Sequence, residues 1–233
     1  MKKKRIDIID ALRGLAVVLM VFHHFMYDLV VFLGAPDWFF SNPVFNFLHY
    51  IFAGLFIFLS GLSSRFSRSN VKRGLKVLAI AFVITIVTGL MDMPIRFGVL
   101  HLLGFCMVFY GVTRKLWDEI PELLMPVLCV VLLVGSALAV HLIPINSSHL
   151  WMLGWMYNGF FSADYFPIFP WLFVFLLGTW AGKFVVEHRL PEWFYEKRVP
   201  VFPAVGKKAL LIYILHQPVL YGLTLGLKYI FKL

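Results

Sequence analysis

The chain has 233 residues, of which 61% are hydrophobic and only 14% are charged. Soluble domains carry about 25% charged residues, so a water-soluble fold of this length would lack the polar surface to cover its core. We therefore predict an all-α fold, a polytopic transmembrane helix bundle.

Apolar segments that are long enough to cross a membrane recur along the whole chain. A spanning helix needs about 20 mostly apolar residues. Seven segments meet this condition, in chain order Ile9–Leu33, Val44–Ser64, Gly74–Met91, Phe97–Leu116, Leu123–Ile143, Phe166–Val186 and Lys208–Ile230. No polar stretch between them is long enough for a separate domain, so we expect residues 1–233 to form a single transmembrane domain.

The distribution of Lys and Arg predicts the direction of insertion. All but three of the 21 Lys and Arg residues, namely Arg96, Lys228 and Lys232, fall on one side of the predicted bundle. Cytoplasmic loops carry an excess of positive residues, which predicts a cytosolic N-terminus and a C-terminus outside. This bias explains most of the net charge of +9 without nucleic acid as a partner. The same surface can attract anionic lipid or an anionic cytosolic ligand.

Cysteine and glycine usage adds little to this picture. Cys106 and Cys129 both fall within predicted spans, so neither a disulfide nor a metal site is indicated. The motifs Gly178-x-x-x-Gly182 and Gly222-x-x-x-Gly226 allow two helices to approach closely. They are compatible with packing inside the bundle and with a homodimer.

The first span carries the richest set of polar residues. Ionisable groups are costly in the membrane and are candidates for function. Arg13 and His24 lie about three turns apart on nearly the same helix face, with a rise of roughly 17 Å between them. Asp28 lies one turn beyond His24, where it can orient the imidazole. His23 points away from this face and is predicted to be peripheral.

Three other spans each place a histidine in the middle or outer half of the predicted membrane: His49, His101 and His216. Asp164 precedes the sixth span on the predicted outer side. A single intramembrane histidine is more often a hydrogen-bonded structural residue than a catalyst. Histidines in four spans at similar depth nevertheless favour a shared site.

Five segments resemble one known family, the catalytic domain of heparan-α-glucosaminide N-acetyltransferase. They are Arg5–Val21, Phe56–Gly61, the residues around His101, Phe169–Phe173 and Gly206–Pro218. The spacing of Arg13 and His24 also resembles the signature of the wider membrane O-acetyltransferases. The chain is much shorter than the lysosomal enzyme and has no evident match to the region that carries its catalytic histidine, so the identity of the acceptor does not transfer.

The resemblance implies transfer of an acetyl group from cytosolic acetyl-CoA to an acceptor on the outer face. We expect the acceptor to be an amine or hydroxyl of a sugar or glycan, and the protein to reside in a bacterial cytoplasmic membrane, surrounded by lipid. On this hypothesis His24 is the general base and Asp28 orients it, or His24 is transiently acetylated. His101 would stabilise the oxyanion or assist proton transfer.

Binding residues follow from the chemistry of this donor. Coenzyme A carries several phosphate charges, which Arg and Lys bind well. The candidates on the predicted cytosolic side are Arg13, Arg65, Arg68, Arg73 and Lys207. For the acceptor, the candidates are His49, Asp164 and His216.

Two other classes of function remain open. Pairs of intramembrane histidines also bind haem in membrane redox proteins. Intramembrane charges and interrupted helices also occur in transporters. A Soret band in the purified protein would indicate the first class, and flux into proteoliposomes without acyl chemistry would indicate the second.

Overall fold

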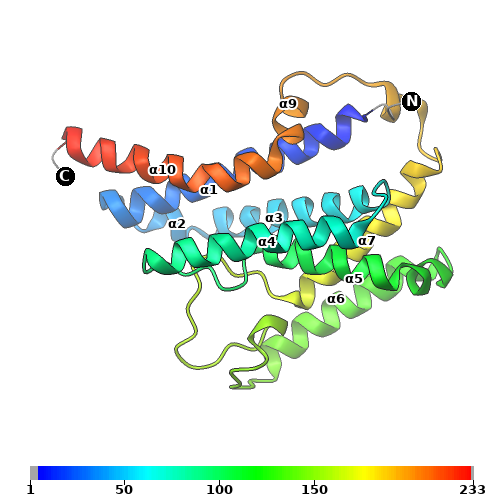
Figure 1. The fold of residues 1–233 in the computed structure, drawn as a ribbon, viewed down its shortest axis with the longest axis horizontal. Helices are drawn as coiled ribbons and strands as arrows, with labels where there is room; N and C mark the ends of the chain where they lie inside the picture. Colours follow the sequence, from blue (N-terminus) through cyan, green and yellow to red (C-terminus); the bar gives the residue numbers. More distant parts are fainter. Residues whose placement is uncertain (1–4, 232–233) are drawn as a thin grey trace. The chain divides into compact units, whose positions relative to one another are not determined.

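The computed structural model describes residues 5–231 and is helical through all seven predicted spans (Figure 1). Lys2, Lys3, Lys4 and Lys232, which contribute to the charge distribution described above, lie outside the described residues. Seven helices are long and apolar enough to cross a membrane, which confirms the predicted number. In residue order they are α1 (Asp7–Leu33), α3 (Pro43–Ser64), α4 (Asn70–Leu90), α5 (Val99–Glu119), α6 (Leu124–Leu142), α7 (Ile168–Val186) and α10 (Ala209–Phe231).

Large apolar side chains remain exposed along these helices. Leu90, Leu123 and Ile230 are 84%, 86% and 69% exposed. In water, apolar patches of this kind would promote aggregation. In a bilayer they are the expected lipid-facing surface, because the hydrocarbon chains are as apolar as leucine.

The chain divides into two compact units, Met1–Leu59 with Leu190–Leu233, and Ser60–Arg189. The first unit contains α1, most of α3, α10 and three short helices: α2 (Trp38–Ser41), α8 (Glu192–Glu196) and α9 (Phe202–Lys207). In this unit α1 packs against α9 and α10, and α10 runs beside α1 in Figure 1. Helix α1 ends at Gly34, whose φ of 67° is the left-handed conformation that glycine favours at a helix end.

Helices α1 and α9 are in backbone contact. A Cβ atom on Gly206 would clash with the carbonyl oxygen of Asp10, and one on Gly14 would clash with the carbonyl of Phe202. Glycine at both positions therefore permits an approach that any side chain would block. This contact fixes α9 against the first two turns of α1.

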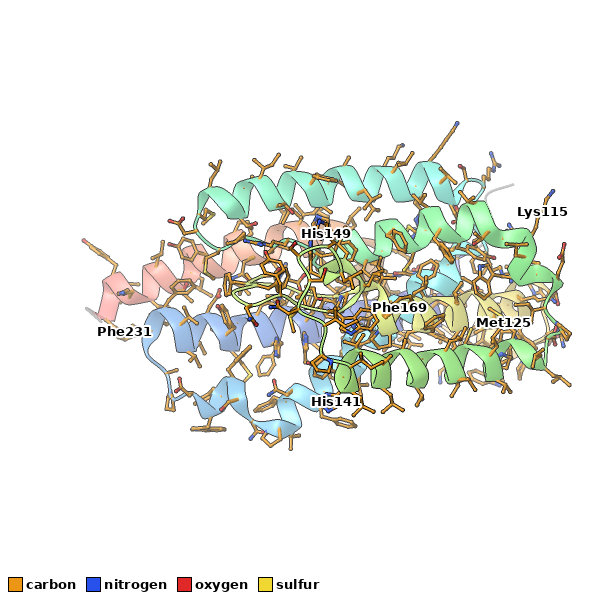
Figure 2. The ribbon with its side chains drawn as sticks, turned by 90° about the horizontal axis from the view of Figure 1, so that it is seen from below. Lys115, Met125, His141, His149, Phe169 and Phe231 are labelled. Carbon is orange, nitrogen blue, oxygen red and sulfur yellow. The ribbon has the colours of Figure 1, made fainter. Side chains whose placement is uncertain are left out.

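The second unit contains the last turn of α3 with α4, α5, α6, α7 and the short helix η1 (Trp151–Leu153). Its packed pairs are α4 with α5 and α6 with α7. A Cβ on Gly74 of α4 would lie 2.7 Å from the Gly104 carbonyl oxygen of α5, so small residues again set a close helix contact. The long connection after α6, which carries His149, runs from His141 to α7 (Figure 2).

Candidate active site

The polar face of α1 begins with a buried ion pair. The Asp10 carboxylate is 4% exposed and accepts hydrogen bonds from Arg13 Nη1 at 2.7 Å and from Arg5 Nε at 2.9 Å. A buried carboxylate is stable when cations and hydrogen bonds compensate its lost hydration. The Arg13 side chain, only 15% exposed, is thus held against its own helix.

His24 lies further along the same helix with one ring nitrogen already occupied. Its Nδ1 atom is 3.0 Å from the Met20 carbonyl oxygen. A carbonyl oxygen can only accept, so Nδ1 must carry the hydrogen, and the distal Nε2 atom has a lone pair in the neutral ring. A histidine held in this tautomer is prepared to act as a base through Nε2.

Asp28 is fully buried, and its partner is on α10. The Gln217 amide nitrogen donates to Asp28 Oδ1 at 2.8 Å. Because a carboxylate accepts, this contact also fixes the orientation of the amide group. No hydrogen bond joins Asp28 to His24 within residues 5–231. The sequence predicted that Asp28 orients His24. In the structure the Met20 carbonyl oxygen binds the His24 ring and fixes its orientation.

His216 brings a second imidazole to this region. Its ring meets the His24 ring at 4.7 Å between centroids in a T-shaped arrangement. His216 Nδ1 lies 2.6 Å from the Tyr213 carbonyl oxygen, so the ring has the same tautomer as His24. The sequence left open whether the histidines of different spans converge, and within the first unit the structure brings the rings of His24 and His216 together.

His23 belongs to the same group, and the prediction that it is peripheral is wrong. Its ring stacks on His49 of α3 at 4.1 Å between centroids and lies 5.9 Å from the His24 ring. Helical periodicity places His23 on a different face of α1 from Arg13. It could not show that the His49 ring of α3 lies against His23 on that face.

Four buried polar atoms in this group have no hydrogen-bond partner: His23 Nε2, Asp28 Oδ2, His216 Nε2 and Gln217 Oε1. Nearly all buried polar groups in native proteins are hydrogen-bonded, and exceptions point to a function or to a bound molecule. We call His23, His24, Asp28, His49, His216 and Gln217 the histidine cluster. Its composition indicates a site for a polar ligand inside the membrane region.

His101, in the second unit, has a different environment. Its Nε2 atom is 3.1 Å from Thr85 Oγ1, and its Nδ1 atom accepts from the Gly98 backbone N–H at 3.3 Å. Thr85 in turn donates to the Ile95 carbonyl at 2.6 Å. Both ring nitrogens are therefore engaged, and this histidine ties the start of α5 to α4 and to the loop between them.

Asp164 has a comparable structural contact. Its Oδ2 atom accepts from the Val99 backbone N–H at 3.1 Å. This carboxylate satisfies a donor at the N-terminus of α5, where negative charge is favoured by the helix dipole. The geometry supports helix capping by this residue, which the sequence had placed among the acceptor-binding candidates.

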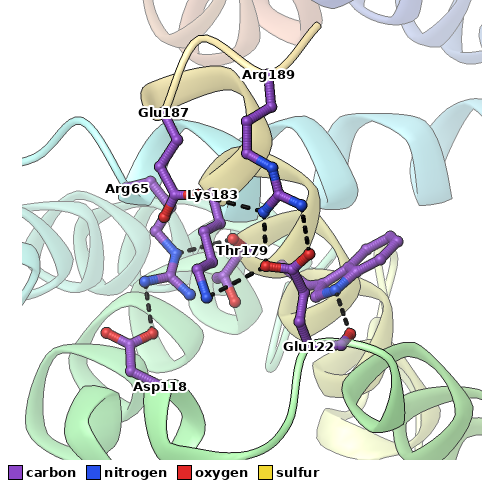
Figure 3. A network of polar contacts seen from close by, with 8 residues as sticks. Arg65, Asp118, Glu122, Thr179, Lys183, Glu187 and Arg189 are labelled. Atoms are coloured by element: carbon purple, nitrogen blue, oxygen red, sulfur yellow. Dashed lines mark hydrogen bonds and ion pairs between the residues drawn. The ribbon is translucent and has the colours of Figure 1, made fainter.

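The cationic candidates for phosphate binding fall into two groups. Arg65 is engaged with Asp118 at 2.5 Å and with the Thr179 carbonyl at 2.8 Å (Figure 3). Arg68, Arg73 and Lys207 are exposed at helix ends and connections. Arg65 therefore supports the fold of the second unit, whereas Arg68, Arg73 and Lys207 have side chains exposed to solvent.

Figure 3 also shows a surface ion-pair network beside Arg65. Arg189 binds Glu122 through two hydrogen bonds of 2.7 Å, and Lys183 approaches the same carboxylate at 3.4 Å. The hydrogen bonds from Arg189 hold the pKa of Glu122 below its usual value, and Glu122 raises the pKa of Arg189. This bidentate pair joins the α5–α6 connection to the end of α7.

Gln217 is the functional candidate that the sequence analysis missed. The cost of placing a charge in the membrane selects ionisable residues as candidates, and an amide carries no charge. A signal did exist, since Gln217 directly follows His216 within an otherwise apolar span. Within residues 5–231, no group of three or more His, Cys, Asp or Glu is arranged to hold a metal ion.

Within residues 5–231, fold and site together define a polytopic membrane protein with seven helices that can span a membrane and a histidine cluster formed by α1, α3 and α10. The family model described as heparan-alpha-glucosaminide N-acetyltransferase, catalytic, matches residues 5–218. The chain belongs to this family, whose members are membrane acetyltransferases, and membership implies acyl-transfer activity. No curated protein and no solved structure matched the chain.

Proposed function

We propose that the protein transfers an acetyl group from acetyl-CoA to an amine or hydroxyl group of a sugar or glycan. The observation that carries this proposal is the family match over residues 5–218. The histidine cluster supports it independently, because acyl transfer to such an acceptor needs a base that removes one proton.

His24 is the base in this proposal. Its Nδ1 atom is fixed by the Met20 carbonyl at 3.0 Å, which leaves the Nε2 lone pair for the acceptor. As the acceptor's electron pair forms a bond to the acyl carbon, its proton moves to His24 Nε2, and the carbon–sulfur bond of the thioester breaks. We propose that His216, whose ring contacts the His24 ring, and Asp28 and His49 in the same cluster bind the acceptor.

The exposed cations fit the chemistry of the donor. Coenzyme A has several phosphate charges, for which guanidinium and ammonium groups are the preferred protein ligands. Arg68, Arg73 and Lys207, each taken by itself, are our candidates for a contact with these phosphates. Arg13 was also predicted to bind coenzyme A. The Asp10 carboxylate already binds its guanidinium at 2.7 Å, so we assign Arg13 a smaller part in phosphate binding.

We also propose that the acetyl group originates in the cytosol and that the acceptor lies on the outer face of a bacterial cytoplasmic membrane. The support is the sequence distribution of Lys and Arg, which favours a cytosolic N-terminus. One family match runs through both compact units in order, which supports a single acyltransferase domain for the chain.

A homodimer through α10 is a further part of this proposal. Gly182 is used inside the second unit, where a Cβ atom would lie 2.6 Å from the Leu62 carbonyl oxygen. By contrast, a Cβ on Gly222 or Gly226 would meet nothing within 4 Å. This open glycine pair permits close approach of a second α10. Mass photometry of the protein in nanodiscs would show a dimer that G222L converts to monomer.

The test of the proposed function uses purified protein in proteoliposomes with radiolabelled acetyl-CoA and a panel of amino sugars and glycans. We expect label in the acceptor for the wild-type protein and for His149→Ala, since His149 is exposed in a loop of the second unit. His24→Ala should lose transfer by about 10²- to 10⁴-fold, the usual contribution of a general base. Undiminished transfer by a folded His24→Ala protein would remove this residue from the chemistry.

Sidedness is tested separately by placing acetyl-CoA and acceptor on opposite sides of the same proteoliposomes. The proposal requires transfer when the two are separated by the bilayer. Transfer only when both are on one side would contradict the transmembrane part while leaving acetyl transfer intact.

A further inference from the structure

Three members of the histidine cluster, His24, His216 and Gln217, use hydrogens in bonds and keep an acceptor atom. His24 and His216 both use Nδ1–H toward a backbone carbonyl of their own helix, so both distal Nε2 atoms carry lone pairs in the neutral rings. Gln217 turns its amide nitrogen toward Asp28 Oδ1, which leaves its oxygen as an acceptor. These three residues therefore present acceptor atoms that a mobile proton or a donor group can satisfy.

The unsatisfied atoms are buried, so water outside the bundle does not compensate them. Asp28 is 0% exposed and His216 is 9% exposed, and Asp28 Oδ2, His216 Nε2 and Gln217 Oε1 have no partner. A buried acceptor without a donor is destabilising, because it has lost its hydrogen bonds to water. Several such atoms in one place are explained if the working site holds a mobile proton or a donor group there.

The two imidazoles are the pair best suited to share a proton. Their rings are 4.7 Å apart between centroids at an interplanar angle of 85°, so the two imidazoles are direct neighbours in an edge-to-face arrangement. Their proton-bearing Nδ1 atoms are both committed to the backbone. A proton can therefore be taken up or released only at the Nε2 atoms.

We propose that His216 is a second base, which shares with His24 the proton removed from the acceptor. This proposal rests on the proposed function and adds a residue and a step to it. His24 takes the acceptor's proton while the new bond to the acyl carbon forms and the carbon–sulfur bond breaks. The proton then passes from His24 Nε2 to His216 Nε2, which restores the His24 lone pair, and it finally reaches the departing thiolate.

The remaining members of the cluster position this pair. Asp28, one turn from His24 on α1, and Gln217, next to His216 on α10, are joined by the 2.8 Å hydrogen bond between them. This contact links the two helices that carry the imidazoles. On the other side of α1, the stacked rings of His23 and His49 lie beside His24.

The first test needs no turnover. Histidine labelled with ¹⁵N in nanodisc-embedded protein reports which ring nitrogen carries hydrogen, and His24→Gln and His216→Gln assign the two signals. We expect both neutral rings to carry hydrogen on Nδ1, and substitution of either residue to shift the signal of the other. A His216 ring with hydrogen on Nε2, or two signals that ignore each other, would overturn the pair even if the protein is an acetyltransferase.

The second test is kinetic. We expect His216→Ala to lower kcat for acetyl transfer at least tenfold with little change in the acceptor KM, and added imidazole to restore part of the loss. His216→Gln, which keeps a polar side chain of similar size, guards against a folding defect, and His149→Ala is the matched control. A kcat within twofold of wild type in either His216 variant, or a loss that imidazole does not reverse, would refute the second base. If the wild-type protein transfers no acetyl group, the proposed function fails, and the ¹⁵N measurement still decides whether the two histidines form a pair.

Discussion

His101 in the second unit is buried and His24 in the first is half-buried, and these two histidines of spanning helices are hydrogen-bonded to different degrees. His101 has partners at both ring nitrogens, Thr85 and the Gly98 N–H. His24 has one backbone partner and sits beside an imidazole and a carboxylate that each retain an unpaired atom. Complete hydrogen bonding is what a structural role requires, whereas unused acceptors are what a reaction site requires. We therefore propose a structural role for His101 and a chemical role for His24.

The largest expected effect is the loss of activity in His24→Leu. Leucine removes the base, so acetyl transfer should fall by about 10²- to 10⁴-fold. It should not lower the melting temperature much, because a polar ring in an incompletely satisfied site is replaced by an apolar side chain. The measurement pairs the transfer assay with thermal unfolding in the same detergent. A large drop in melting temperature would show that His24 is as structural as His101.

His101→Leu should have the opposite profile. The substitution leaves Thr85 and the Gly98 N–H without their partner in a buried setting, which costs about 1–3 kcal/mol for each group. We expect a lower melting temperature with kcat per folded molecule nearly unchanged. Thr85→Val removes the same link from the other side and should give a smaller decrease. A selective loss of kcat in folded His101→Leu would return this residue to the chemistry.

A third prediction concerns how the first unit holds its site. Gly206→Ala places a Cβ against the Asp10 carbonyl, so α9 must move away from α1, at a cost of roughly 1–3 kcal/mol. Gly135→Ala in α6 meets nothing within 4 Å and should be neutral or slightly stabilising. Thermal unfolding of both variants checks the difference. Equal melting temperatures would mean that the close contact between α1 and α9 does not determine stability.

The smallest effect is expected at the surface network of the second unit. The pKa of Glu122 is held below its usual value by Arg189, so its ion pair contributes stability above the ordinary glutamate pKa. This contribution is lost as the pH falls through the lowered pKa, because the carboxylate is then protonated in the folded protein. Glu122→Gln should therefore flatten the acid side of the stability profile slightly. Exposed pairs contribute little, so a large change would indicate a role beyond the surface.

The fold was predictable from the sequence because its main determinant is local. Runs of about 20 apolar residues identify spanning helices without knowledge of their neighbours, and all seven were found. The pairing of Arg13 with Asp10 is also local, three residues apart on one helix. The candidates His24, Asp28 and His216 could be selected because ionisable groups are costly within spans.

The rest of the site depends on contacts between distant segments. Nothing near Arg65 in the sequence indicates that Asp118 and the Thr179 carbonyl would occupy it. The same holds for Asp164, whose partner is the Val99 N–H, and for His23, whose partner His49 comes from another helix. Helical periodicity gives the direction of a side chain, but the neighbouring helix decides what it meets.

The most direct measurement is a structure of the protein in nanodiscs with a non-reactive acetyl-CoA analogue. The proposed function requires the acyl carbonyl to lie beside His24 Nε2, with His216 on the other side of the His24 ring. An acyl group bound beside His101, or at any place away from the histidine cluster, would contradict the assignment of the reaction to this cluster.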